Sequence, residues 1–83
     1  MNNYQVEIYA VFNGVKKVFY NYSKENMHFE DLKISILKRL GNIHYFERDK
    51  QLVKQLIYNA KTIDEMLDEI SIKTRFIITV KYY

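Results

Sequence analysis

The chain has 83 residues, of which 48% are hydrophobic and 16% aromatic, and it carries a formal net charge of +3 without any cysteine or proline. A chain of this length forms one domain with a modest core, so neither a second domain nor a deep ligand pocket is expected. The lack of cysteine excludes disulfides, thiolate zinc sites and cysteine nucleophiles.

The N-terminal part of the sequence predicts a β-hairpin. Apolar and polar residues alternate from Tyr4 to Phe12, which is the period of a half-buried strand. Asn13-Gly14 comes next and is a strong signal for a hairpin turn. A second strand is therefore expected from Val15 to Tyr22.

The length of the hairpin loop decides which side chains share a face. A two-residue loop at Asn13-Gly14 would pair Ala10 with Lys17 and mix polar with apolar residues on both faces. A three-residue loop, with Gly14 at a left-handed bulge position, sorts the faces better, and we predict this register. Its pairs are Ile8 with Val18, Val6 with Tyr20, Glu7 with Phe19 and Gln5 with Asn21.

An apolar stripe at helical spacing predicts a helix between Phe29 and Leu40. Acidic residues in its first turn and basic residues in its last turn suit the helix dipole, and Gly41 provides a stop. Residues 43–60 are ambiguous. We favour a helix from about Arg48 to Asn59, while short strands at Ile43–Phe46 and Leu52–Ile57 remain alternatives.

The C-terminal part predicts a short helix and a final strand. Thr62 and Glu65 have the spacing of a capping box, which opens a helix from Ile63 to Ile70. A strand follows from Arg75 to about Tyr82, with an alternation that is interrupted only by Ile77.

These elements together predict a single α+β domain over residues 1–83. The hairpin, the central helices and the C-terminal strand are expected to form a small mixed sheet packed on helices, in a β-grasp-like arrangement. The first and last strands would then be central and parallel.

Four segments carry a pattern known from one family. They are Val6-Glu-Ile-Tyr9, His28-Phe-Glu-Asp-Leu32, Thr62-Ile-Asp-Glu-Met-Leu67 and Arg75-Phe-Ile-Ile-Thr-Val80. In this order they resemble the ubiquitin-like β-grasp and, within it, the Phox-and-Bem interaction domain. The resemblance implies a fold but no site. That family pairs through a first-strand lysine or an acidic cluster, whereas Gln5 and Glu7 stand in the first strand here and bases interrupt the acids of residues 47–50.

The hairpin supplies the best candidate for a binding surface. In the predicted register its apolar side chains point away from the helices, and an exposed patch of this kind marks an interface unless a helical segment covers it. The predicted protein-binding residues are Tyr9, Val11, Val15, Lys17 and Phe19. We expect either a homodimer through this face or sheet extension by the edge strand Val15–Tyr22.

A second candidate is a nucleic-acid contact at Lys16, Lys17 and Tyr20. Basic side chains beside aromatic ones can combine phosphate neutralisation with base stacking. The alternative interpretation is a solvated surface, because bases and acids are interspersed along the chain.

No candidate catalytic, metal or cofactor site is expected. His28 and His44 are the only histidines, and two histidines without cysteine or a carboxylate motif make a poor metal site. The acidic residues at 30–31 and 64–69 are interpreted as solvated helix faces rather than paired catalytic carboxylates.

The function expected from these observations is a non-enzymatic protein–protein interaction module, with a small basic nucleic-acid-binding regulator as the alternative. The chain is rich in residues with AT-rich codons, which favours a source such as a phage or virus and a role in binding and inhibiting or modulating a host protein. We expect a cytoplasmic protein, because the sequence shows neither a signal peptide nor a membrane-spanning apolar run.

Overall fold

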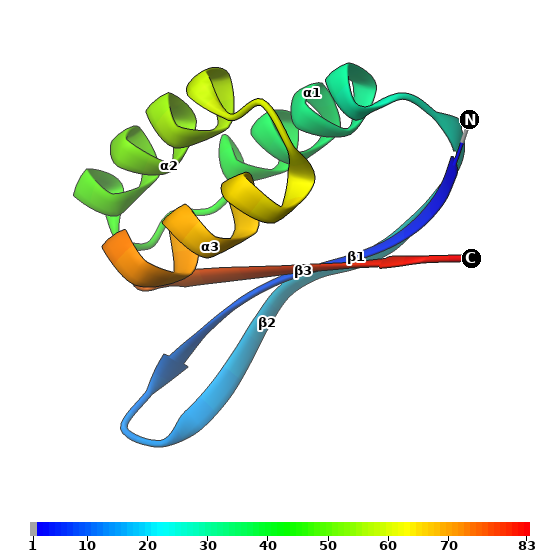
Figure 1. Cartoon of the computed structure of the whole chain (residues 1–83). Helices are drawn as coiled ribbons and strands as arrows, with labels where there is room; N and C mark the ends of the chain where they lie inside the picture. The colour runs from blue at the N-terminus through cyan, green and yellow to red at the C-terminus, as the bar shows by residue number, and fades with distance from the viewer. Residues whose placement is uncertain (1) are drawn as a thin grey trace.

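The computed structural model describes residues 2–83 as an antiparallel sheet with three helices on one of its faces (Figure 1). The elements are β1 (Asn2–Phe12), β2 (Val15–Met27), α1 (Phe29–Leu40), α2 (Glu47–Asn59), α3 (Ile63–Lys73) and β3 (Phe76–Tyr82). The predicted α+β class is confirmed, with the hairpin, the central helices and the C-terminal strand in the predicted order.

The direction of the last strand differs from the prediction. The strand order is β2-β1-β3, and β1 pairs antiparallel with both neighbours, so the sheet is antiparallel rather than mixed. The reason is the position at which the chain leaves α3 and enters the sheet. Phe76 begins β3 beside Ala10, at the hairpin end of β1, and Tyr82 ends beside Tyr4. A strand that starts at that end can only run back against β1.

The hairpin turn has two residues, so the predicted three-residue loop is wrong. Asn13 and Gly14 have φ angles of 48° and 80°, and Phe12 pairs directly with Val15. Two consecutive positive φ angles are typical of a type I′ turn, whose twist matches that of the flanking strands. The Asn-Gly signal therefore predicts the turn correctly, and the error lies in the register assigned to it.

A β-bulge at Phe19 is the physical reason why the register differs from the predicted one. Tyr9 pairs with Val18 and Ile8 with Tyr20, so Phe19 is the extra residue. The bulge shifts the rest of β2 by one residue and brings Tyr20 to the same side as Ile8. The mixing of faces that argued against a two-residue loop is removed in this way.

The helices settle the ambiguous middle of the chain. Residues 47–59 form α2, so the strand alternative at Leu52–Ile57 is wrong, and residues 43–46 form a loop rather than a strand. The α1 boundaries are confirmed, and α3 runs three residues beyond the predicted Ile70. Thr62 Oγ1 accepts from the Glu65 N–H at 3.1 Å, while the Glu65 carboxylate accepts from the N–H of Lys61 instead of that of Thr62.

The core lies between the sheet and the helices. Its members alternate along the strands and follow one face of each helix, as a half-buried sheet and amphipathic helices require. The largest fully buried side chains are Tyr4, Val6, Ile8, Leu32, Ile36, Leu40, Val53, Ile57, Met66, Ile70 and Phe76. Because this burial uses one face of the sheet, the opposite face of β1, β2 and β3 is left without a helical layer (Figure 1).

Two buried lysines tie the helical layer together. Lys33 Nζ donates to the Ala60 carbonyl at 2.5 Å, and Lys50 Nζ donates to the Ile43 carbonyl at 2.6 Å. The first bond joins α1 to the end of α2, and the second joins α2 to the loop that precedes it. Each ammonium group also has a carboxylate within 4 Å, from Glu30 and Glu47 respectively.

Candidate protein-binding surfaces

The face of the sheet opposite the helices carries four neighbouring apolar side chains, which we call the outer apolar cluster. They are Tyr9 and Val11 on β1, Val18 on β2 and Ile77 on β3. Tyr9 pairs with Val18 on one side and with Ile77 on the other. Directly paired residues of an antiparallel sheet share a face. Val11 is 52% exposed and Val18 is 45% exposed, so these two side chains remain largely in contact with water.

Polar side chains border the outer apolar cluster. Lys16 Nζ lies 2.7 Å from Glu7 Oε1 and 4.3 Å from the centroid of the Tyr9 ring. The hydrogen bond to Glu7 raises the pKa of Lys16, so this lysine keeps its charge while it packs on the cluster. Further along the same face, Gln5 forms side-chain hydrogen bonds with Asn21 and Ser23. The face thus has an apolar end beside the turn and a polar end beyond it.

The structure places two of the five predicted protein-binding residues on this face. Tyr9 and Val11 lie there as predicted. Val15 and Lys17 pair with Phe12 and Ala10, which belong to the helix-side face, so the predicted five do not form one patch. Phe19 is the clear correction, since its ring packs against those of Phe76 and Tyr45, at centroid distances of 5.8 and 5.6 Å.

Two residues of the outer apolar cluster were missed from the sequence. The predicted three-residue loop places Val18 on the opposite face. Ile77 interrupts the predicted alternation of the last strand. That interruption was the available signal, because an apolar residue at a solvent-facing strand position indicates a second buried or binding face.

Aromatic side chains fill the helix-side surface next to the hairpin turn. Phe12 stacks on Phe46 with the ring centroids 5.1 Å apart, and Phe46 meets Phe76 edge-on. Arg75 lies over Phe46, 4.0 Å from its ring centroid, and its Nε donates to Asp49 Oδ2 at 2.9 Å. This cluster attaches the twisted end of the hairpin to the start of α2, so it has a structural role.

The predicted nucleic-acid residues do not gather either. Lys16 lies on the outer face, where it pairs with Glu7, whereas Lys17 and Tyr20 belong to the helix side. The Lys17 ammonium is 5.0 Å from the Tyr45 ring centroid. Consecutive strand residues point to opposite faces, so a Lys-Lys pair in a strand cannot form one basic patch.

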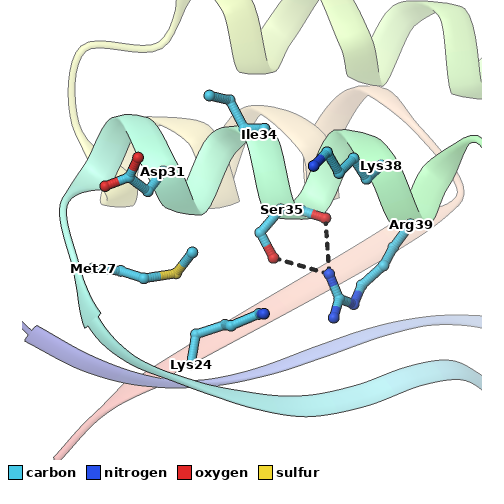
Figure 2. A pocket seen from close by; sticks show the side chains of 7 residues that line it. All are labelled: Lys24, Met27, Asp31, Ile34, Ser35, Lys38 and Arg39. Atoms are coloured by element: carbon cyan, nitrogen blue, oxygen red, sulfur yellow. Dashed lines mark hydrogen bonds between the residues drawn. The ribbon is translucent and has the colours of Figure 1, made fainter.

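A groove separates α1 from the second half of β2. Its volume is about 360 Å³, and three of its side chains are cationic, against one carboxylate. The lining residues are Lys24, Met27, Asp31, Ile34, Ser35, Lys38 and Arg39, and Figure 2 shows them along β2 and α1. The groove was not predicted from the sequence, since Lys24 lies on β2 whereas Lys38 and Arg39 lie on α1.

Arg39 is held in place within this groove. Its Nη1 donates to the Ser35 carbonyl at 3.2 Å and to Ser35 Oγ at 3.0 Å (Figure 2). Its guanidinium carbon lies 3.6 Å from the centroid of the Tyr22 ring. Ser35 Oγ in turn donates to the Tyr22 hydroxyl at 3.0 Å, and burial raises the pKa of Tyr22.

Within residues 2–83, no group of three or more histidine, aspartate or glutamate side chains is placed to hold a metal ion. His28 lies at the start of α1, as predicted, and His44 is exposed in the loop after it. No helix in the described part of the chain is long and apolar enough to cross a membrane.

Comparison with known proteins adds no assignment to this geometry. Neither a family model, nor a curated protein, nor a solved structure matches the chain. The resemblance to Phox-and-Bem interaction domains therefore stays a prediction, and the functional argument depends on the surfaces themselves.

Proposed function

We propose that this protein is a non-catalytic interaction module that binds another protein through the outer face of its sheet. The observation that carries the proposal is the outer apolar cluster, which gathers side chains from all three strands on the face opposite the helices. Removal of apolar surface from water contributes about 25 cal/mol per Å². Adjacent exposed apolar side chains on an ordered sheet are therefore a favourable docking surface.

The composition of the face supports a protein partner. An apolar centre with polar residues around it is the usual anatomy of a protein–protein interface. Here Lys16 and Glu7 form an ion pair beside the cluster, so their charges are already matched when a partner arrives. Tyr9 contributes a large ring with few rotatable bonds, which loses little entropy on binding.

The partner is either a different protein or a second copy of this chain. The chain is rich in residues that have AT-rich codons, which favours a different protein as the partner. The chain would then be a small phage or viral protein that acts in the cytoplasm on a host protein. A nucleic-acid role is less well supported, because Lys16 and Lys17 lie on opposite faces of the sheet.

The proposal is tested by affinity capture from a source or host lysate treated with nuclease. Val18→Asp places a charge within the outer apolar cluster, on its β2 side, and Ile72→Asp makes the same change at a 78% exposed position on α3. We expect the wild type and Ile72→Asp to capture the same protein, or to self-associate equally, and Val18→Asp to do neither. Circular dichroism checks that both variants are folded. Equal capture by folded Val18→Asp would overturn the proposal.

A further inference from the structure

The outer edge of β2 is an open pairing site. In the part of the chain that the structure describes, β2 pairs with β1 alone, and it is the longest strand of the sheet at 13 residues. Every second residue of an edge strand directs its N–H and C=O groups away from the sheet. These N–H and C=O groups can form hydrogen bonds with the backbone of another extended segment.

The groove between α1 and β2 borders this open edge. It is lined by Lys24 and Met27 of β2 and by residues of α1, without any residue of β1. Figure 2 shows the Lys24 side chain extending from β2 toward Arg39, with Lys38 higher on the helix. A strand added beside β2 would lie about 4.8 Å further out, and alternate side chains on it would point up into the groove.

The cations of the groove are available to a partner. Among residues 2–83, none of Lys24, Lys38 and Arg39 forms an ion pair, whereas Lys16, Lys33, Lys50, Lys73 and Arg75 each do. Arg39 is oriented by Ser35 and by the Tyr22 ring, so little side-chain entropy remains to be lost when it binds an anion.

We propose that an acidic extended segment of a partner protein pairs with the free edge of β2 as a fourth strand. Carboxylates at alternate positions of that segment enter the groove and meet Lys24, Lys38 and Arg39. The backbone pairing supplies affinity, and the spacing of the carboxylates supplies specificity. This inference rests on the proposed function in taking the partner to be a protein. The surface that it uses is a different one.

Two other occupants fit the groove less well. A nucleic acid has no donors and acceptors in the pattern of a strand edge, so it would leave the free backbone groups of β2 without partners. A second copy paired through β2 would bring another set of the same cations to this edge, and like charges oppose such pairing.

The test uses a fluorescein-labelled peptide of about nine residues in which glutamate alternates with threonine. Its binding to the full chain is followed by fluorescence anisotropy at low salt. We compare the wild type with Lys24→Glu/Lys38→Glu, and with Arg48→Glu/Lys61→Glu as a control that makes the same charge change at exposed positions outside the groove. The groove variant should bind at least about tenfold more weakly, and the control should match the wild type.

Strand addition is separated from simple charge attraction by peptide N-methylation. Two peptides are methylated on opposite sets of alternate N–H groups. One set faces β2 and should weaken binding by about tenfold or more, while the other set faces away and should not. Equal binding by both methylated peptides, or equal binding by a peptide with glutamine in place of glutamate, would overturn the proposal.

Two further measurements separate the alternatives. An oligothymidylate that binds more tightly than the acidic peptide, and is lost in the groove variant, would overturn the inference in favour of a nucleic acid. Val18→Asp should leave peptide binding unchanged. A failure at the groove is therefore distinguishable from a failure at the outer apolar cluster.

Discussion

The ring of Phe19 packs on the ring of Phe76, with the two centroids 5.8 Å apart. Phe19 is the extra residue of the bulge in β2, and Phe76 is the first residue of β3, on the other side of β1. The contact therefore joins the two edge strands across the central one and attaches the bulge to the core.

The first prediction follows from this contact. Phe19→Ala should lower the free energy of unfolding by about 2 kcal/mol, somewhat less than a fully buried phenylalanine, because the side chain is only partly buried. Val18→Ala, one residue earlier but on the exposed outer face, should cost about 0.5 kcal/mol or less. Urea denaturation followed by circular dichroism measures both. Equal losses for the two variants would contradict the assignment of Phe19 to the helix side.

The hairpin turn gives the second prediction. Gly14 has φ of +80° and no heavy atom within 4 Å of an added Cβ, so Gly14→Ala strains the backbone without a steric clash. We expect a loss of about 1 kcal/mol. Gly41 has an ordinary helical φ of −59°, so Gly41→Ala should be neutral or stabilising by about 0.5 kcal/mol. Thermal denaturation of the two variants provides the comparison, and similar shifts in Tm would argue against a type I′ turn.

The buried Lys50 gives the third prediction. Lys50→Met keeps most of the side-chain volume but leaves the Ile43 carbonyl without its 2.6 Å hydrogen bond. An unsatisfied buried carbonyl costs about 1–3 kcal/mol, and we expect that loss of stability. Lys54→Met, on the same helix at a half-buried position, is the matched control and should change stability by less than about 0.5 kcal/mol. If both variants have the same urea denaturation midpoint as the wild type, the hydrogen bond of Lys50 does not stabilise the fold.

The fourth prediction concerns pH. Hydrogen bonds from the Arg75 side chain hold the pKa of the Asp49 carboxyl below its usual range. A lowered folded-state pKa means that the pair stabilises the fold above about pH 4, the unfolded value, and that this stability is lost as the pH falls through the folded-state pKa. The stability difference between the wild type and Asp49→Asn should therefore be largest near neutral pH and shrink in acid. A difference that stays constant from neutral pH down to pH 2 would show that the Asp49 charge is not involved.

Much of the fold could be read from local patterns. Helical spacing predicted α1 and favoured α2, the capping-box spacing of Thr62 and Glu65 predicted α3, and Asn13-Gly14 predicted the turn, because these signals depend on neighbouring residues. The bulge at Phe19 and the direction of β3 could not be predicted in the same way. Both depend on contacts between residues far apart in the sequence, such as those of Phe19 with Phe76 and of Phe76 with Ala10.

The candidate surfaces were harder to predict than the fold. Tyr9 and Val11 lie on the outer face as predicted, because the face of a strand residue follows from alternation alone. Val18 is missing from the predicted surface because a one-residue error in register moves a side chain to the opposite face. The groove at Lys24 and Arg39 exists only because α1 lies beside β2 in three dimensions, so no local pattern could predict it.

The most direct test of the central claim is photo-crosslinking from the outer face. A photoreactive p-benzoylphenylalanine is introduced in place of Val18 and, as a control, in place of Ile72, which is 78% exposed on α3. Each protein is irradiated in lysate and alone, and the cross-linked products are identified by mass spectrometry. We predict one specific protein adduct, or a cross-linked dimer, from position 18 and none from position 72. The same products from both positions, or a product from position 72 alone, would contradict the claim that the outer face binds the partner.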